Sequence, residues 1–148
     1  MKSPILGAVL LVSLVTLSSC SKPRELGGQY SGIGIESATV DHGGKVTPYR
    51  RAPGNETVTV MRDAGTALRI RFGSCELPAT ARPDGIGAKI NAGAMCTGNG
   101  EAGIPMSGAF HSTEAVGGGL SVLIVGGGPT ADGKTTYSFS FTGTRLPR

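Results

Sequence analysis

The chain has 148 residues, of which 25 are glycine and none is tryptophan, and its formal net charge is +4. Glycine costs about 1 kcal/mol per helix position relative to alanine, so this composition disfavours a helical domain and favours turns, bulges and small strands. The basic residues are scattered, and they lack the clustering and the stacking aromatic residues of a nucleic-acid-binding surface. No nucleic-acid partner is therefore expected.

The N-terminal segment has the pattern of a signal peptide. Lys2 precedes an apolar run over residues 5–17, which ends at two serines and a cysteine. A helix needs about 20 apolar residues to cross a bilayer, so a permanent spanning helix is not expected. One interpretation is an ordinary secretory signal that is cleaved after Ser19.

Leu17, Ser18, Ser19 and Cys20 resemble the lipobox of bacterial lipoproteins. The resemblance implies that Cys20 carries a diacylglycerol on its sulfur, that cleavage precedes it, and that its new amine is acylated. Two or three acyl chains anchor a protein stably, which implies a membrane attachment. Ser21 follows the cysteine in place of an aspartate, and by the sorting rule of enteric bacteria this implies the outer membrane of the cell envelope.

The domain organisation follows from this resemblance and from composition. Residues 1–19 are the expected signal peptide, residues 20–28 a lipidated N-terminus with a polar, proline-containing tether, and residues 29–148 a single β-barrel domain with a modest core.

Once Cys20 is assigned to lipid, Cys75 and Cys96 remain for an oxidising compartment, and a disulfide is the economical interpretation. A bridge that closes a loop of about 20 residues stabilises a fold by roughly 3 kcal/mol. A redox pair and two metal ligands are the alternatives, but the chain has neither a Cys-x-x-Cys spacing nor a histidine near these cysteines.

In chain order, period-two alternation predicts a first strand over residues 30–35, a turn at residues 41–44 and a short strand over residues 45–51. The clearest hairpin comes next. Its inward residues are Val58, Val60, Leu68, Ile70 and Phe72; Thr57, Thr59, Arg69 and Arg71 face water, and residues 63–65 link the strands.

The alternation continues through Cys75, Leu77, Ala79 and Ala81, and after a turn at residues 82–85 through Ile86, Ala88, Ile90 and Ala92. Residues 106–111, with Met106, Gly108 and Phe110 on one face, form a further expected strand. The apolar run at residues 120–125 is expected to be the most buried strand.

The last expected strand alternates Tyr137, Phe139 and Phe141 with polar residues, and it can close the sheet against the first. Eight or nine short strands, hairpin after hairpin, predict an all-β fold. We expect a small antiparallel meander β-barrel with one disulfide, and a β-sandwich is the alternative.

Three motif matches lack the context that their function needs. Residues 128–135 satisfy the phosphate-loop pattern, but that loop must open a helix, and residues 136–142 alternate as a strand. Residues 98–103 match G-x-G-x-x-G without a following helix. Residues 55–57 match a glycosylation sequon but are interpreted as turn chemistry before a strand. No nucleotide is expected to bind.

The titratable residues give no catalytic, cofactor or metal assignment. His42 and His111 are the only histidines, and both are expected in or beside loops without ligand spacing. The aspartates lie in glycine-containing turns, where local hydrogen bonding favours them: Asp41, Asp63, Asp84 and Asp132. No Gly-x-Ser-x-Gly elbow is present. An enzyme and a cofactor are therefore not expected.

The leading hypothesis is a lipid-anchored envelope lipoprotein that acts as a noncatalytic binding or assembly module. Its partner would be an envelope protein or a small apolar ligand. The expected architecture resembles that of periplasmic lysozyme inhibitors, which implies an inhibitor of a lytic enzyme as an alternative, although their loop motif is absent. A hydrolase is the third hypothesis. A cavity lined by the inward residues would favour a ligand, whereas a filled interior with an exposed apolar patch would favour a protein partner.

Overall fold

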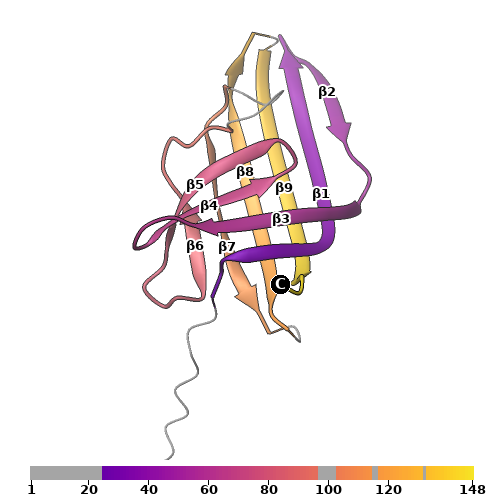
Figure 1. The fold of residues 1–148 in the computed structure, drawn as a ribbon. Helices are drawn as coiled ribbons and strands as arrows, with labels where there is room; N and C mark the ends of the chain where they lie inside the picture. Colours follow the sequence, from indigo (N-terminus) through magenta and orange to yellow (C-terminus); the bar gives the residue numbers. More distant parts are fainter. Residues whose placement is uncertain (1–24, 97–102, 115–116, 132) are drawn as a thin grey trace, which may run out of the picture.

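The structure is a computed structural model, and it describes residues 25–96, 103–114, 117–131 and 133–148. These residues form nine antiparallel strands and no helix, and eight of the strands close into a meander barrel (Figure 1). The predicted all-β meander barrel is confirmed, and its closure rules out the sandwich alternative. The strands are β1 (Gly28–His42), β2 (Lys45–Arg50), β3 (Gly54–Arg62), β4 (Ala67–Phe72), β5 (Cys75–Ala81), β6 (Gly87–Ile90), β7 (Met106–Thr113), β8 (Gly119–Thr130) and β9 (Gly133–Arg145).

Strand β1 closes the barrel and is much longer than the predicted strand over residues 30–35. One edge pairs with β9 from Tyr30 to Asp41. The other edge pairs first with β3, up to Gly34, and then with β2, from Ser37 onward. Figure 1 shows the first part of β1 crossing the lower barrel beside β3 and the second part rising beside β9. Strand β2 is therefore an extra strand that lies outside the closed ring.

The interior is a packed core to which all eight barrel strands contribute. The predicted inward residues of β3, β4 and β9 are all buried, with at most 5 % of each residue exposed. Phe72 and Phe139 stack across the interior with ring centroids 4.3 Å apart. Such aromatic pairs stabilise a core by about 0.5–1.5 kcal/mol beyond the burial of their area.

Two predictions about individual strands are wrong. Strand β8 is not the most buried strand, because Leu120, Val122 and Ile124 are buried while Leu123 and Val125 are 57 % and 43 % exposed. The prediction failed because the sequence alone does not distinguish an apolar residue on the outer face of a strand from a buried one. Strand β6 is shorter than expected, since Ile86 and Ala92 lie outside it and are exposed.

The predicted disulfide is confirmed. Cys75 begins β5 and Cys96 lies in the segment that follows β6, and their Cα atoms are 4.8 Å apart with an S–S distance of 1.99 Å. The bridge therefore ties the β4–β5 turn to the connection that leads toward β7, across 21 residues of sequence.

Because neighbouring strands run antiparallel, successive connections alternate between the two ends of the barrel. The end that receives residues 25–27, which we call the N-terminal end, also carries the β3–β4, β5–β6 and β7–β8 connections. The opposite end carries the β2–β3, β4–β5, β6–β7 and β8–β9 connections. The β8–β9 hairpin lies at the top of Figure 1, whereas residue 25 enters from below.

The N-terminal end is sealed by the start of the described chain. Leu26 is 1 % exposed and belongs to the core, so barrel packing begins three residues before the predicted boundary at residue 29. The Tyr30 hydroxyl donates to the Leu26 carbonyl at 2.8 Å. The Arg145 guanidinium lies 5.3 Å from the Tyr30 ring centroid and donates to its hydroxyl at 2.9 Å. Burial raises the pKa of Tyr30, and Arg145 opposes that rise.

Candidate binding cavity at the end of the barrel

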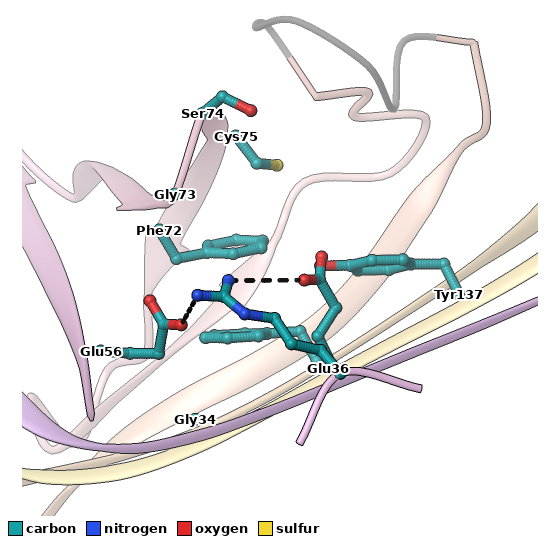
Figure 2. A pocket seen from close by; sticks show the side chains of 10 residues that line it. Gly34, Glu36, Glu56, Phe72, Gly73, Ser74, Cys75 and Tyr137 are labelled. Atoms are coloured by element: carbon teal, nitrogen blue, oxygen red, sulfur yellow. Dashed lines mark hydrogen bonds and ion pairs between the residues drawn. The ribbon is translucent and has the colours of Figure 1, made fainter. Parts of the chain in front are cut away.

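A cavity of about 180 Å³ opens at the end opposite the N-terminal end. It lies between the bend of β1, the start of β3, the β4–β5 turn and the inner face of β9 (Figure 2). Its walls combine charged, aromatic and backbone surfaces. The lining residues are Gly34, Glu36, Arg51, Glu56, Phe72, Gly73, Ser74, Cys75, Tyr137 and Phe139.

Two carboxylates and one guanidinium dominate the polar part of this cavity. Arg51 Nη2 lies 3.0 Å from Glu56 Oε1, and Arg51 Nη1 lies 3.9 Å from Glu36 Oε2. The Tyr137 hydroxyl donates to Glu36 Oε1 at 2.8 Å. Figure 2 shows the two glutamates reaching toward each other from opposite sides, with dashed lines marking both ion pairs.

The alternation of the strands brings these side chains inside the mouth of the barrel. Glu36 is in phase with the inward Tyr30 of β1, and Glu56 is in phase with the inward Val58 of β3. Gly34 makes room for Glu56, because a Cβ on Gly34 would overlap the Glu56 side chain. The backbone N–H of Arg51 donates to the Glu36 carbonyl at 3.0 Å and holds the β2–β3 connection over the cavity.

The three charged groups differ in exposure. The side chains of Glu36 and Glu56 are 26 % and 18 % exposed, whereas that of Arg51 is 56 % exposed. A carboxylate has about four acceptor positions, so one guanidinium and one tyrosine hydroxyl leave both glutamates with acceptor capacity. The cluster carries two negative charges against one positive charge, and it is therefore suited to a cationic group.

Aromatic rings and the disulfide complete the wall. The stacked Phe72 and Phe139 line the cavity together with the charged residues, and Cys75 lines it beside the β4–β5 turn. The Cys75–Cys96 bridge thus braces the wall that faces the carboxylates. A ligand that combines positive charge with a flat apolar face would meet both kinds of surface.

A second hollow lies on the outer face of β6, β7 and β8. The exposed Leu123 and Val125 form its apolar floor, with Ala109 between Leu123 and Lys89 in the strand register. Arg82 and Lys89 line it as well, and Arg82 is paired with Asp84 at 2.6 Å. This groove is an exposed apolar patch on the outer face of the barrel.

An ion-pair cluster covers the outer face of β4 and β5. Arg69 donates to both carboxylate oxygens of Asp63 and to Glu76, and Arg71 donates to Glu76 at 2.8 Å. Hydrogen bonds from Arg69 lower the pKa of Asp63, and those from Arg71 and Arg69 lower the pKa of Glu76. The hydrogen bonds that Arg69 donates to Asp63 and to Glu76 raise the pKa of Arg69.

The phosphate-loop match at residues 128–135 lies on a β-hairpin, as its context predicted. Gly128 pairs with Thr135 and Thr130 with Gly133, so the described part of the motif belongs to the antiparallel strands β8 and β9. These described residues open no helix, and they are paired in the strand ladder instead. The described part of the other glycine motif is residue 103 alone.

The remaining predicted residues are distributed over the surface. His42 is the last residue of β1 and lies beside the turn at Gly43 and Gly44, and His111 lies within β7, near its end; both are exposed. Asp41 accepts a hydrogen bond from the Gly44 N–H and Asp84 one from the Ile86 N–H, in agreement with their predicted turn roles. Cys20 and Asp132 lie outside the described residues.

Sequence reasoning missed the cavity cluster. The sequence pattern gives Arg51 no role, and it places Tyr137 only among the alternating apolar positions of the last strand. The available signal was a charged residue at an inward position of a strand, which occurs at Glu36 and again at Glu56. A charged side chain at an inward position of a strand needs a polar partner, and here the partners come from segments far apart in the chain.

Within the described ranges, no group of three or more His, Cys, Asp or Glu residues is arranged to hold a metal ion. No helix in that part of the chain is long and apolar enough to cross a membrane. Comparisons with protein-family models, with curated proteins and with solved structures give no match.

Proposed function

We propose that the chain is a lipid-anchored lipoprotein of the bacterial outer membrane, and that its barrel is a noncatalytic binding module for a protein partner. The lipobox-like residues that end at Cys20 support the anchor, since they follow an apolar run that is too short to span a bilayer.

The packed interior is the observation that carries the binding part of the proposal. The inward residues of all eight barrel strands form one core cluster, and of the five expected in the first hairpin only Phe72 lines the cavity. A small apolar ligand inside the barrel would need the volume that these core side chains fill. Binding is therefore assigned to the open mouth of the barrel, where the end cavity lies, and to the outer face, where the groove at Leu123 and Val125 lies.

Residue 25, where the described chain begins, lies at the end of the barrel opposite the cavity. Residues 21–25 span at most about 18 Å when fully extended, so an anchor on Cys20 would keep the N-terminal end close to the bilayer. The cavity would then face away from the membrane that holds the protein, toward partners in the surrounding compartment. A binding module needs this orientation for access.

Replacing the lipidated cysteine tests the anchor. Cys20→Ser is expected to abolish labelling by a radioactive fatty acid, and to move the protein from the membrane fraction to the soluble fraction or leave it unprocessed. Cys75→Ala is the matched control, because it removes another cysteine and is expected to keep the label. Undiminished labelling of Cys20→Ser would contradict the proposal.

A further inference from the structure

We propose that the end cavity recognises a guanidinium group of a partner protein, and that Arg51 is an internal cation that the partner's arginine replaces. The inference deepens the proposed function and rests on it for the protein nature of the partner. The chemistry of recognition comes from the cavity itself.

The cavity already holds a guanidinium between two carboxylates. Arg51 Nη2 lies 3.0 Å from Glu56 Oε1, while its Nη1 is 3.9 Å from Glu36, which is beyond hydrogen-bond distance. The internal cation thus satisfies one carboxylate well and the other poorly. A guanidinium that enters from outside is free to approach Glu36 more closely and to fill the remaining 180 Å³.

Arg51 is placed to leave the cavity without unfolding the barrel. It lies in the short connection between β2 and β3, outside both strands, and its side chain is 56 % exposed. Exposed ion pairs contribute little to stability, with a typical value of about 0–1 kcal/mol. The two glutamates, by contrast, project from β1 and β3 and stay in the cavity wall.

Once Arg51 swings out, Glu36 and Glu56 are left as neighbouring like charges in a partly dry site, which is unfavourable. A cation from a partner relieves that repulsion. Arginine suits the site better than lysine, because its planar group donates in several directions at once and lies flat on aromatic rings. Phe72 and Phe139 supply such rings in the wall.

The outer face of β4 and β5 provides an internal comparison. There Arg71 donates to Glu76 at 2.8 Å on an open strand surface, and neither residue lines the cavity. An arginine paired with a glutamate therefore occurs in this chain both with and without a cavity. Replacing Arg71 controls for the general effect of removing a surface arginine.

The test uses the processed, disulfide-intact lipoprotein in detergent and two capped pentapeptides. One peptide carries arginine at its centre, and the other carries citrulline, which has nearly the same shape without the charge. Peptide binding is followed by NMR through the ring signals of Tyr137. Arg51→Gln is expected to bind the arginine peptide roughly tenfold more tightly than the wild type, since an internal charged competitor has been removed.

In the Arg51→Gln variant, the additional replacement Glu56→Gln is expected to abolish the gain in affinity for the arginine peptide. Arg71→Gln in the otherwise wild-type protein is expected to leave that affinity unchanged. The citrulline peptide should not bind any variant. Equal affinities of Arg51→Gln and wild type, or equal binding of both peptides, would overturn the cation site. The fatty-acid labelling experiment tests the anchor and does not involve the cavity. The two proposals can therefore fail separately.

Discussion

Gly133 packs against the main-chain carbonyl oxygen of Asp41, where β9 begins beside the end of β1. Its φ is +129°, and a Cβ at this position would overlap that carbonyl oxygen. Both the backbone conformation and the close approach therefore require glycine. The contact lies on the seam that closes the barrel, which makes it a direct test of the closure.

We expect Gly133→Val to lower the free energy of unfolding by at least about 1–3 kcal/mol, because a β-branched residue strains this backbone and must also push β1 away. Urea denaturation measures the change. Lys134→Ala is the neighbouring control: Lys134 is exposed, and surface substitutions usually change stability by less than about 0.5 kcal/mol. Equal stability of Gly133→Val and wild type would contradict the seam geometry.

The hairpin at residues 128–135 leads to a prediction about nucleotides. Because Gly128 and Thr135 are paired across antiparallel strands, the described residues of the motif form no helix N-terminus at which to hold phosphate. Calorimetric titration with ATP and magnesium is expected to give no binding by the wild type or by Lys134→Ala. Micromolar binding that Lys134→Ala removes would contradict the hairpin assignment.

The disulfide is expected to contribute a large share of the stability. The bridge between Cys75 and Cys96 closes 21 residues of sequence, for which the chain-entropy account gives roughly 3 kcal/mol. Cys75→Ala should lower the free energy of unfolding by about that amount. Thiol counting on denatured protein purified from its native source should find neither cysteine free. Two reactive thiols would refute the bridge in the native protein.

The ion-pair cluster on β4 and β5 predicts a pH-dependent contribution to stability. The pKa values of Asp63 and Glu76 are lowered in the folded state, relative to about 3.9 and 4.3 in the unfolded chain. Their contribution is therefore present above those unfolded values and is lost as the pH falls through the lowered folded values. Arg69→Gln should reduce the melting temperature slightly at pH 7, and the difference should vanish in acid.

Thermal melts at low ionic strength measure this effect, because salt screens exposed pairs. Arg50→Gln is the matched control, since Arg50 is an exposed arginine at the end of β2. A difference between wild type and Arg69→Gln that persists unchanged below pH 2 would show that the arginine acts through packing and not through the carboxylates.

The hairpins were predictable because their information is local. Alternation at Val58 and Val60, and again at Phe139 and Phe141, is visible within a few residues, and the same side chains are buried in the barrel. The path of β1 was not predictable. Its second half pairs with β2 on one edge and β9 on the other, and residues 36–40 mix small, polar and apolar side chains without clear alternation.

The disulfide could be predicted, because only two cysteines remained for it, but the cavity could not. Glu36 and Tyr137 are joined by a hydrogen bond across 101 residues of sequence, and Arg51 reaches both glutamates from a connection between strands. No local pattern contains that geometry. Strand alternation places Glu36 and Glu56 on the inward faces of their strands. Whether the two side chains come together depends on how the barrel closes.

Site-specific photo-crosslinking in the intact envelope tests the central claim, a membrane-anchored barrel that binds a protein at the end opposite its anchor. A photoreactive residue at Ala52, exposed beside Arg51, probes the cavity end; one at Thr144, exposed near the end of β9, probes the N-terminal end. We predict a discrete protein adduct from Ala52 and none from Thr144. An adduct from Thr144 alone, or none from either position, would contradict the account.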